Sequence, residues 1–246
     1  TIKNLQYSES LYKFISITNS YNSLIPRNSD FNLYLQITKE ISVASTKTFV
    51  CSSIMLFILS LKLSNDFMVN LDCIYEISDN FHKMIYDKKL EKKLNNIVEK
   101  IFNKNLIFLS SNKNNHPIAL ESNLKFREIC YTFSLSSSAK NLKHGPLALV
   151  DNNCYIFHFV NNEFDYKYAK SVMNEVKSRN GNNILITTYK DYNPELFVDV
   201  IEIESNSEMI NNLLLIYPMQ LLTFLYGKKS GNTMDTPKNL AKTVTV

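Results

Sequence analysis

The stretch CYIFHFV at residues 154–160 decides the fold class, because it is apolar at nearly every position. A strand with one face in water would alternate apolar and polar residues, so this run predicts a strand that is covered on both faces. The helical pattern of residues 163–179 follows it, and strand-like stretches return at 183–188 and 198–203. This alternation predicts an α/β fold in which helices cover both faces of a parallel sheet.

The same alternation extends toward the N-terminus and to the end of the chain. Further strands are predicted at 13–18, 33–37 and 106–109, and helices at 46–63, over most of 66–103, and at 207–226. Residues 227–246 show little periodicity and are predicted to form an ordered tail. Two sheets fit this pattern. We therefore expect one domain at residues 1–104, with its connecting helices, and a second at 105–246.

Composition excludes several classes of function. The net charge of the 246 residues is only +4, and the basic residues are spread out apart from the lysines within residues 88–93, so no nucleic-acid partner is expected. The most apolar run, residues 49–63, is short and contains serines and a lysine, so it predicts a core helix and no membrane span.

Most of the four cysteines sit in apolar runs, which predicts buried thiols in a reducing compartment and points to the cytoplasm. They are Cys51, Cys73, Cys130 and Cys154, and no two of them have CxxC spacing. No histidine-cysteine cluster stands near them, so no metal site is expected.

One predicted helix, opened by Pro117, carries three charges: Glu121, Lys125 and Glu128. Spacings of four and three place them on one side of the helix. Four apolar neighbours predict that the helix is largely buried: Leu120, Leu124, Phe126 and Ile129. Charges facing a half-buried space are costly unless they are paired or used. The set therefore suits proton transfer on a carbonyl compound, although a simple ion pair between Glu128 and Lys125 is the structural alternative.

Four segments of the chain together resemble the isomerase half of the glutamine–fructose-6-phosphate aminotransferase family. They are residues 40–49 (EISVASTKTF), 119–128 (ALESNLKFRE), 143–149 (KHGPLAL) and 237–246 (PKNLAKTVTV). The resemblance implies two sugar-isomerase (SIS) domains, each a doubly wound parallel sheet flanked by helices. It also implies that the first of these domains is incomplete at its N-terminus.

The resemblance implies three catalytic residues. Glu128 would move a proton between C1 and C2 of the sugar, as a positioned carboxylate can. His144 would open the sugar ring from across the interface of a homodimer, because imidazole is acid or base near neutral pH. Lys242 would engage the sugar carbonyl as an imine. The structural alternatives are a loop-capping histidine and an exposed terminal lysine.

The resemblance also implies binding residues. Val43, Ser45 and Ala241 would line the sugar-phosphate site, and Glu121 and Lys125 would support the catalytic carboxylate. Ser45 and Thr46 equally suit the N-terminus of a helix, where capping alone would explain them. The family's chemistry requires no metal and no organic cofactor.

The implied reaction converts fructose 6-phosphate and glutamine into glucosamine 6-phosphate and glutamate, with ammonia from a glutaminase domain of the same full-length protein. Thr1 stands downstream of the family's glutaminase domain and phosphate-binding loop, so we expect upstream segments to be absent from this chain. A Gly-Arg-Gly turn of the family is replaced at 110–112 by Ser-Ser-Asn, and a Gly-Glu by Lys140-Asn141. Two alternatives therefore stay open: a non-catalytic SIS module that binds sugar phosphates, and an inactive truncated remnant.

Overall fold

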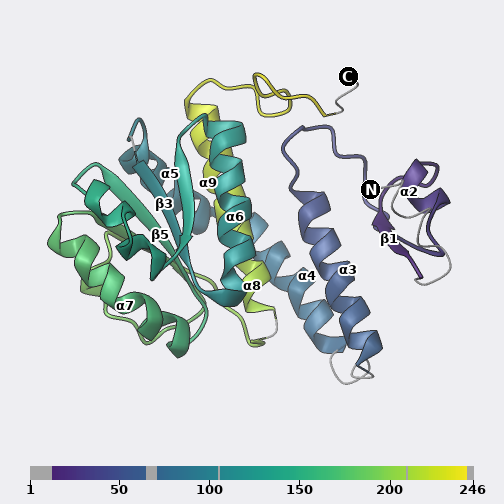
Figure 1. The fold of residues 1–246 in the computed structure, drawn as a ribbon, viewed down its shortest axis with the longest axis horizontal. Helices are drawn as coiled ribbons and strands as arrows, with labels where there is room; N and C mark the ends of the chain where they lie inside the picture. The colour runs from purple at the N-terminus through teal and green to yellow at the C-terminus, as the bar shows by residue number, and fades with distance from the viewer. Residues whose placement is uncertain (1–12, 65–70, 105, 209, 243–246) are drawn as a thin grey trace. The chain divides into compact units, whose positions relative to one another are not determined.

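A computed structural model of the protein describes residues 13–64, 71–104, 106–208 and 210–242 (Figure 1). The chain divides into two compact units, Thr1–Ile74 and Tyr75–Val246. The predicted domain boundary between residues 104 and 105 lies further along the chain and stays a prediction. Within the described residues, none of the helices combines the length and the apolar character that a membrane span requires.

The first unit contains a two-stranded parallel sheet. Strand β1 (Ile15–Thr18) pairs with β2 (Phe31–Tyr34), and the short helix α2 (Leu24–Arg27) lies in the connection between them. The long helix α3 (Lys47–Leu63) follows. The first strand and the long helix were predicted closely, whereas β2 begins two residues before its predicted start.

Five parallel strands form the sheet of the second unit, in the order β4-β3-β5-β6-β7. Their bounds are Leu106–Ser111 for β3, Ser134–Ser138 for β4, Cys154–Val160 for β5, Asn182–Thr187 for β6 and Asp199–Glu202 for β7. The predicted α/β class with a parallel sheet is therefore confirmed. Strand β4 was not predicted because its sequence, SLSSS, has only one apolar residue and otherwise lacks the residues that mark a strand.

Helices cover both faces of this sheet, as predicted. They are α5 (Lys88–Ile101), α6 (His116–Lys125), α7 (Glu163–Ser178), α8 (Asn211–Leu214) and α9 (Ile216–Lys229), and α4 (Leu71–Tyr86) precedes them. Figure 1 shows α7 on one side of the sheet and α5, α6 and α9 on the other. Strand β5 contributes buried side chains to both faces of the sheet. Ile156 belongs to the hydrophobic cluster that includes Val172 and Met173 of α7. The ring of Phe157 lies 5.8 Å from that of Phe126.

Candidate functional site

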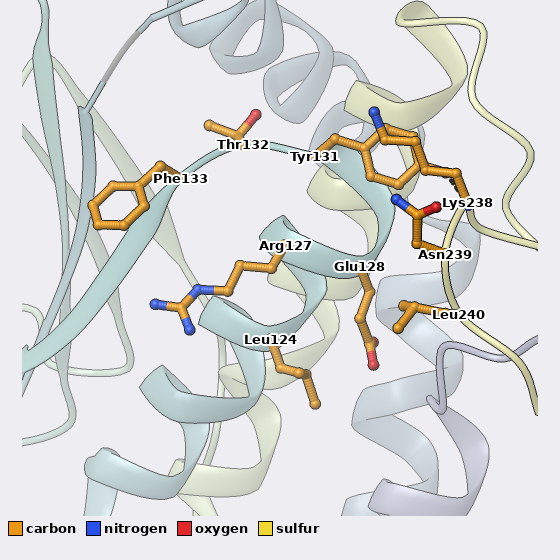
Figure 2. A pocket seen from close by; sticks show the side chains of 9 residues that line it. All are labelled: Leu124, Arg127, Glu128, Tyr131, Thr132, Phe133, Lys238, Asn239 and Leu240. Carbon is orange, nitrogen blue, oxygen red and sulfur yellow. Dashed lines mark hydrogen bonds between the residues drawn. The ribbon is translucent and has the colours of Figure 1, made fainter. Parts of the chain in front are cut away.

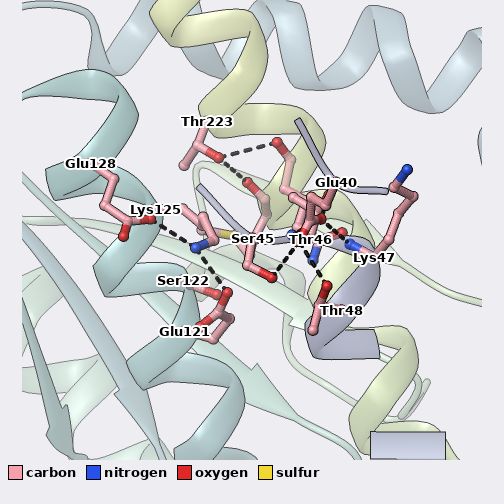
Figure 3. A network of polar contacts seen from close by, with 12 residues as sticks. Glu40, Ser45, Thr46, Lys47, Thr48, Glu121, Ser122, Lys125, Glu128 and Thr223 are labelled. Atoms are coloured by element: carbon pink, nitrogen blue, oxygen red, sulfur yellow. Dashed lines mark hydrogen bonds and ion pairs between the residues drawn. The ribbon is translucent and has the colours of Figure 1, made fainter. Parts of the chain in front are cut away.

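Lys125, at the end of α6, is the centre of a buried ion-pair network (Figure 3). Its Nζ lies 3.0 Å from Glu121 Oε1 and 2.8 Å from Glu128 Oε2. The Lys125 side chain is only 1% exposed, and those of Glu121 and Glu128 are 11% and 17% exposed. A buried ammonium needs such partners, because desolvation alone would cost several kcal/mol. The predicted clustering of the three charges is confirmed.

The apolar neighbours of this network are divided between core and surface. Phe126 and Ile129 are buried, as expected, but Leu120 and Leu124 are 48% and 44% exposed, so the prediction of burial was wrong for these two. Residues 120 and 124 stand four apart and share a face of α6, and the buried side of α6 is formed by Ile118, Ala119 and Ser122 instead.

The predicted helix does not continue unchanged to Ile129. Helix α6 ends at Lys125, and a π-helical turn, Phe126–Cys130, carries Glu128. This turn ends at Tyr131, whose backbone is left-handed with φ 53° and ψ 32°. Single π turns inside helices occur frequently at functional sites because the extra residue re-aims the side chains around it.

A cavity of ≈ 580 Å³ opens beside the Glu128 carboxylate (Figure 2). Its lining comes from the helix, the turn after it and the C-terminal tail: Leu124, Arg127, Glu128, Tyr131, Thr132, Phe133, Lys238, Asn239 and Leu240. Most of the surface that lines the cavity is apolar. An acidic side chain at the edge of a largely apolar cavity is the arrangement expected of a positioned general base.

The tail reaches the cavity through hydrogen bonds to the π turn. The Asn232 side-chain amide donates to the Ile129 carbonyl at 2.7 Å, and the Lys238 backbone N–H donates to Tyr131 Oη at 2.7 Å. Ala241 and Lys242 follow the lining residues directly and are exposed. The structure thus brings the segment just before Lys242 to Glu128, whereas Lys242 and Ala241 are not among the lining residues.

His144 lies in an exposed loop of the second unit. The loop runs between two 3₁₀ turns, Asn141–Lys143 and Pro146–Leu149, and Gly145 has φ 129°, a value that L side chains rarely adopt. Lys143 ties the loop to α7 by donating to Ser171 Oγ at 2.8 Å. His144 is not among the residues that line the cavity of Glu128.

Val43 and Ser45 lie half-buried in the loop before α3, in the first unit. The Ser45 hydroxyl donates to Glu40 Oε2 at 2.8 Å. Helix α3 begins at Lys47, so Thr46 is its N-cap residue, but the Thr46 side chain makes no capping hydrogen bond. The expectation that Ser45 and Thr46 stand at a helix N-terminus is confirmed, while capping by their own hydroxyls was wrong.

Glu40 caps α3 and was missed from the sequence. Its carboxylate accepts hydrogen bonds from the backbone N–H of Thr46 (2.8 Å) and Lys47 (2.9 Å), and from the hydroxyls of Ser45 and Thr48. Partial burial would raise the pKa of the Glu40 carboxyl, but these donors outweigh it and lower the pKa to about 2. An acidic residue shortly before a helix is the signal that could have indicated this cap.

Glu40→Gln is expected to lower the free energy of unfolding by about 1 kcal/mol at neutral pH, as loss of a helix cap does. Because the folded state lowers the pKa, the stabilisation is complete above pH 4.5 and disappears as the pH falls toward 2. Urea unfolding of wild type and variant at pH 7 and pH 2.5 measures both effects. The exposed Glu195→Gln is the control, and equal stability of wild type and Glu40→Gln at pH 7 would contradict the assignment.

A second polar cluster occupies the crevice between the carboxyl ends of β3 and β5, where doubly wound sheets commonly bind ligands. Asp165 accepts from Asn112 and Asn115, both at 2.9 Å, and Asn161 donates to Asn115 Oδ1 at 2.7 Å. Burial raises the pKa of Asp165, while these donors oppose the shift. These buried side chains are thus hydrogen-bonded to one another, which the sequence did not indicate.

The remaining histidines and the cysteines are not among the residues that line the cavity of Glu128. His158 is fully buried in β5, and the exposed His82 lies beside Tyr86. All four cysteines are free thiols; Cys130 and Cys154 are buried, and burial raises the pKa of Cys154 to about 12. Among the described residues, no group of three or more histidine, cysteine or acidic side chains could hold a metal ion.

Comparison with known proteins decides the family. The family model described as SIS domain matches residues 100–222, which is half of the chain and includes the whole network of Lys125. The chain belongs to the SIS-domain family. This confirms the resemblance and the fold class inferred from the sequence.

Relatives of this SIS chain include glutamine–fructose-6-phosphate aminotransferases. That of Chlorobaculum tepidum is 33% identical over 241 residues, and that of Aquifex aeolicus is 33% identical over 235 residues. Each match covers 94% of this chain and 39% of the relative. The SIS chain therefore spans about two fifths of the length of these relatives.

A solved structure shows the same fold over nearly the whole chain. The C-terminal domain of glucosamine-fructose-6-phosphate aminotransferase from Francisella tularensis superimposes with a TM-score of 0.84 at 28% identity. The match covers 96% of this SIS chain and 69% of that structure. Together the relatives support a phosphosugar isomerase module of the SIS family.

Proposed function

We propose that this chain is the isomerase part of a glutamine–fructose-6-phosphate aminotransferase. The complete reaction converts fructose 6-phosphate and glutamine into glucosamine 6-phosphate and glutamate. The observation that carries the proposal is Glu128, which borders a cavity closed on another side by tail residues 238–240 and is hydrogen-bonded to a buried lysine. The likeness to aminotransferases over 94% of the chain supports the choice of reaction.

Each proposed residue has one role. Glu128 takes a proton from one of the two carbons C1 and C2 and returns it to the other, while Lys125 holds the carboxylate in place. Lys242 captures the open-chain carbonyl as an imine, and the tail anchored at Lys238 brings it toward the cavity. His144 opens the ring. Because its loop is exposed and lies outside the cavity, we propose that it acts on the sugar held by a partner subunit of a homodimer.

The remaining roles concern substrate and ammonia. Val43, Ser45 and Ala241 contact the sugar phosphate, and Glu121 shares Lys125 with the catalytic carboxylate. A glutaminase domain of the full-length protein supplies ammonia. The four free thiols support action in a reducing compartment, the cytoplasm.

Glu128→Gln is expected to lower glucosamine 6-phosphate formation at least about 100-fold, because the amide cannot take up the proton. The assay uses the full-length protein that carries this chain and measures sugar product and glutamine hydrolysis side by side. Hydrolysis should stay measurable, since the substitution lies in the isomerase part. The exposed Glu163→Gln, at the start of α7, is the matched control.

Unchanged synthesis in Glu128→Gln would overturn the assigned role. Thermal unfolding with and without glucosamine 6-phosphate separates the rival functions, because a ligand that binds only the folded state raises the melting temperature. A raised melting temperature without synthesis in the wild type would identify a binding module. A chain that neither melts cooperatively nor responds to the sugar would be an inactive remnant.

A further inference from the structure

Tyr131 stands where the turn that carries Glu128 meets the C-terminal tail (Figure 2). Its hydroxyl accepts the backbone N–H of Lys238 at 2.7 Å, and the Lys238 ammonium lies 4.3 Å from the centre of its ring. Lys238 of the tail therefore contacts both the hydroxyl and the aromatic ring of Tyr131. Tyr131 and Lys238 are separated by 107 positions in the chain.

The backbone conformation of Tyr131 is unfavourable for a tyrosine, which indicates that its side chain has a use. A φ of 53° is adopted readily by glycine and rarely by other residues, and it costs a tyrosine roughly 1 kcal/mol. Local backbone preference would therefore favour glycine here. A strained residue that persists at a functional site indicates that its side chain has a use. In this structure, that use is the pair of contacts with Lys238.

Docking shortens the part of the tail that acts as a tether for Lys242. Asn232 holds the tail to the Ile129 carbonyl at 2.7 Å, and Tyr131 holds it again at Lys238, so that Lys242 follows this second anchor by only four positions. Four residues span at most about 14 Å, whereas the ten residues from Asn232 would span about 36 Å. For a flexible tether, this shortening raises the effective concentration of the end about fourfold.

We infer that Tyr131 is a positioning residue that docks the tail and thereby confines Lys242 to the neighbourhood of the Glu128 cavity. The inference rests on the proposed function for the role of Lys242, but the docking itself does not. Tyr131 has no part in proton transfer. It acts through the backbone of Lys238, and the side chain of Lys238 adds a cation–π contact.

The test combines hydrogen exchange with kinetics on the full-length protein. Tyr131→Phe keeps the ring and removes the acceptor, so the Lys238 amide should exchange about 10-fold faster, as expected when one hydrogen bond is lost. Synthesis of glucosamine 6-phosphate should fall about 3-fold to 10-fold in kcat, while glutamine hydrolysis and the melting temperature stay unchanged. Lys238→Met removes only the cation–π contact and should have a smaller effect of the same kind.

Tyr75→Phe, at an exposed tyrosine of α4, is the matched control and should change neither measurement. Unchanged exchange at Lys238 in Tyr131→Phe would overturn the docking, whatever the activity. Faster exchange with unchanged synthesis would overturn the positioning role. Failure of the proposed function itself gives a different result: Glu128→Gln would keep full synthesis while Tyr131→Phe still accelerated exchange of the tail.

Discussion

Lys125→Met is expected to lower the free energy of unfolding by about 3 kcal/mol. Removing one partner of a buried ion pair leaves an uncompensated charge and typically costs 3–5 kcal/mol. Here two carboxylates, those of Glu121 and Glu128, lose their shared ammonium at once. Both keep some exposure to water, so we place the effect at the lower end of that range. Urea unfolding at pH 7 measures the loss.

A triple variant separates charge from packing. Glu121→Gln and Glu128→Gln, added to Lys125→Met, remove the charges that the single substitution leaves unpaired, so most of the lost stability should return. The exposed Lys190→Met is a matched control and should shift stability by no more than about 0.5 kcal/mol. A triple variant as unstable as Lys125→Met would show that Lys125 stabilises the protein through packing of its aliphatic stem instead.

The protein is expected to lose about 3 kcal/mol of stability between pH 6.5 and pH 4 because of His158. Burial lowers the pKa of this histidine to about 4, and its hydrogen bond to Asn183 only partly opposes the shift. In this window the unfolded chain binds a proton that the folded chain does not. Stability is therefore complete above pH 6.5 and decreases as the pH falls.

The hydrogen-bond partners around His158 show which ring nitrogen carries the proton of the neutral side chain. The Asn183 amide nitrogen donates to the carbonyls of Met173 and Leu196, so its Oδ1 must accept from His158 Nε2, at 2.8 Å. The proton is thus assigned to Nε2. Nδ1 is buried with no hydrogen-bond partner among the described residues. Protonating Nδ1 would bury a cation without an acceptor.

His158→Gln tests this assignment, because its amide can still donate to Asn183 but does not titrate. Urea unfolding from pH 7.5 to pH 4 should show a pH dependence that is flatter than that of the wild type by about 3 kcal/mol. His82→Gln, at an exposed histidine, should leave the wild-type curve unchanged. A His158→Gln curve parallel to the wild type would contradict the lowered pKa.

Part of the site could be predicted because its contacts are local. The charges of Glu121, Lys125 and Glu128 meet on one helix face, and spacing alone reports such contacts. The exposure of Leu120 and Leu124 could not be predicted in this way. Which apolar side chains of a helix are buried depends on the sheet and the helices that pack against it. The sequence of this helix has apolar residues on more than one side, and only one side can be buried.

The sequence by itself determined the α/β class, the parallel strands and the charged network. Strands buried on both faces must be continuously apolar, and residues three or four apart on a helix must meet. Only the tertiary structure decided the rest: the serine-rich strand β4, the π turn that carries Glu128, and the docking of the tail on Tyr131. Each of these depends on partners beyond the local pattern, which in the case of Tyr131 and Lys238 stand 107 positions apart.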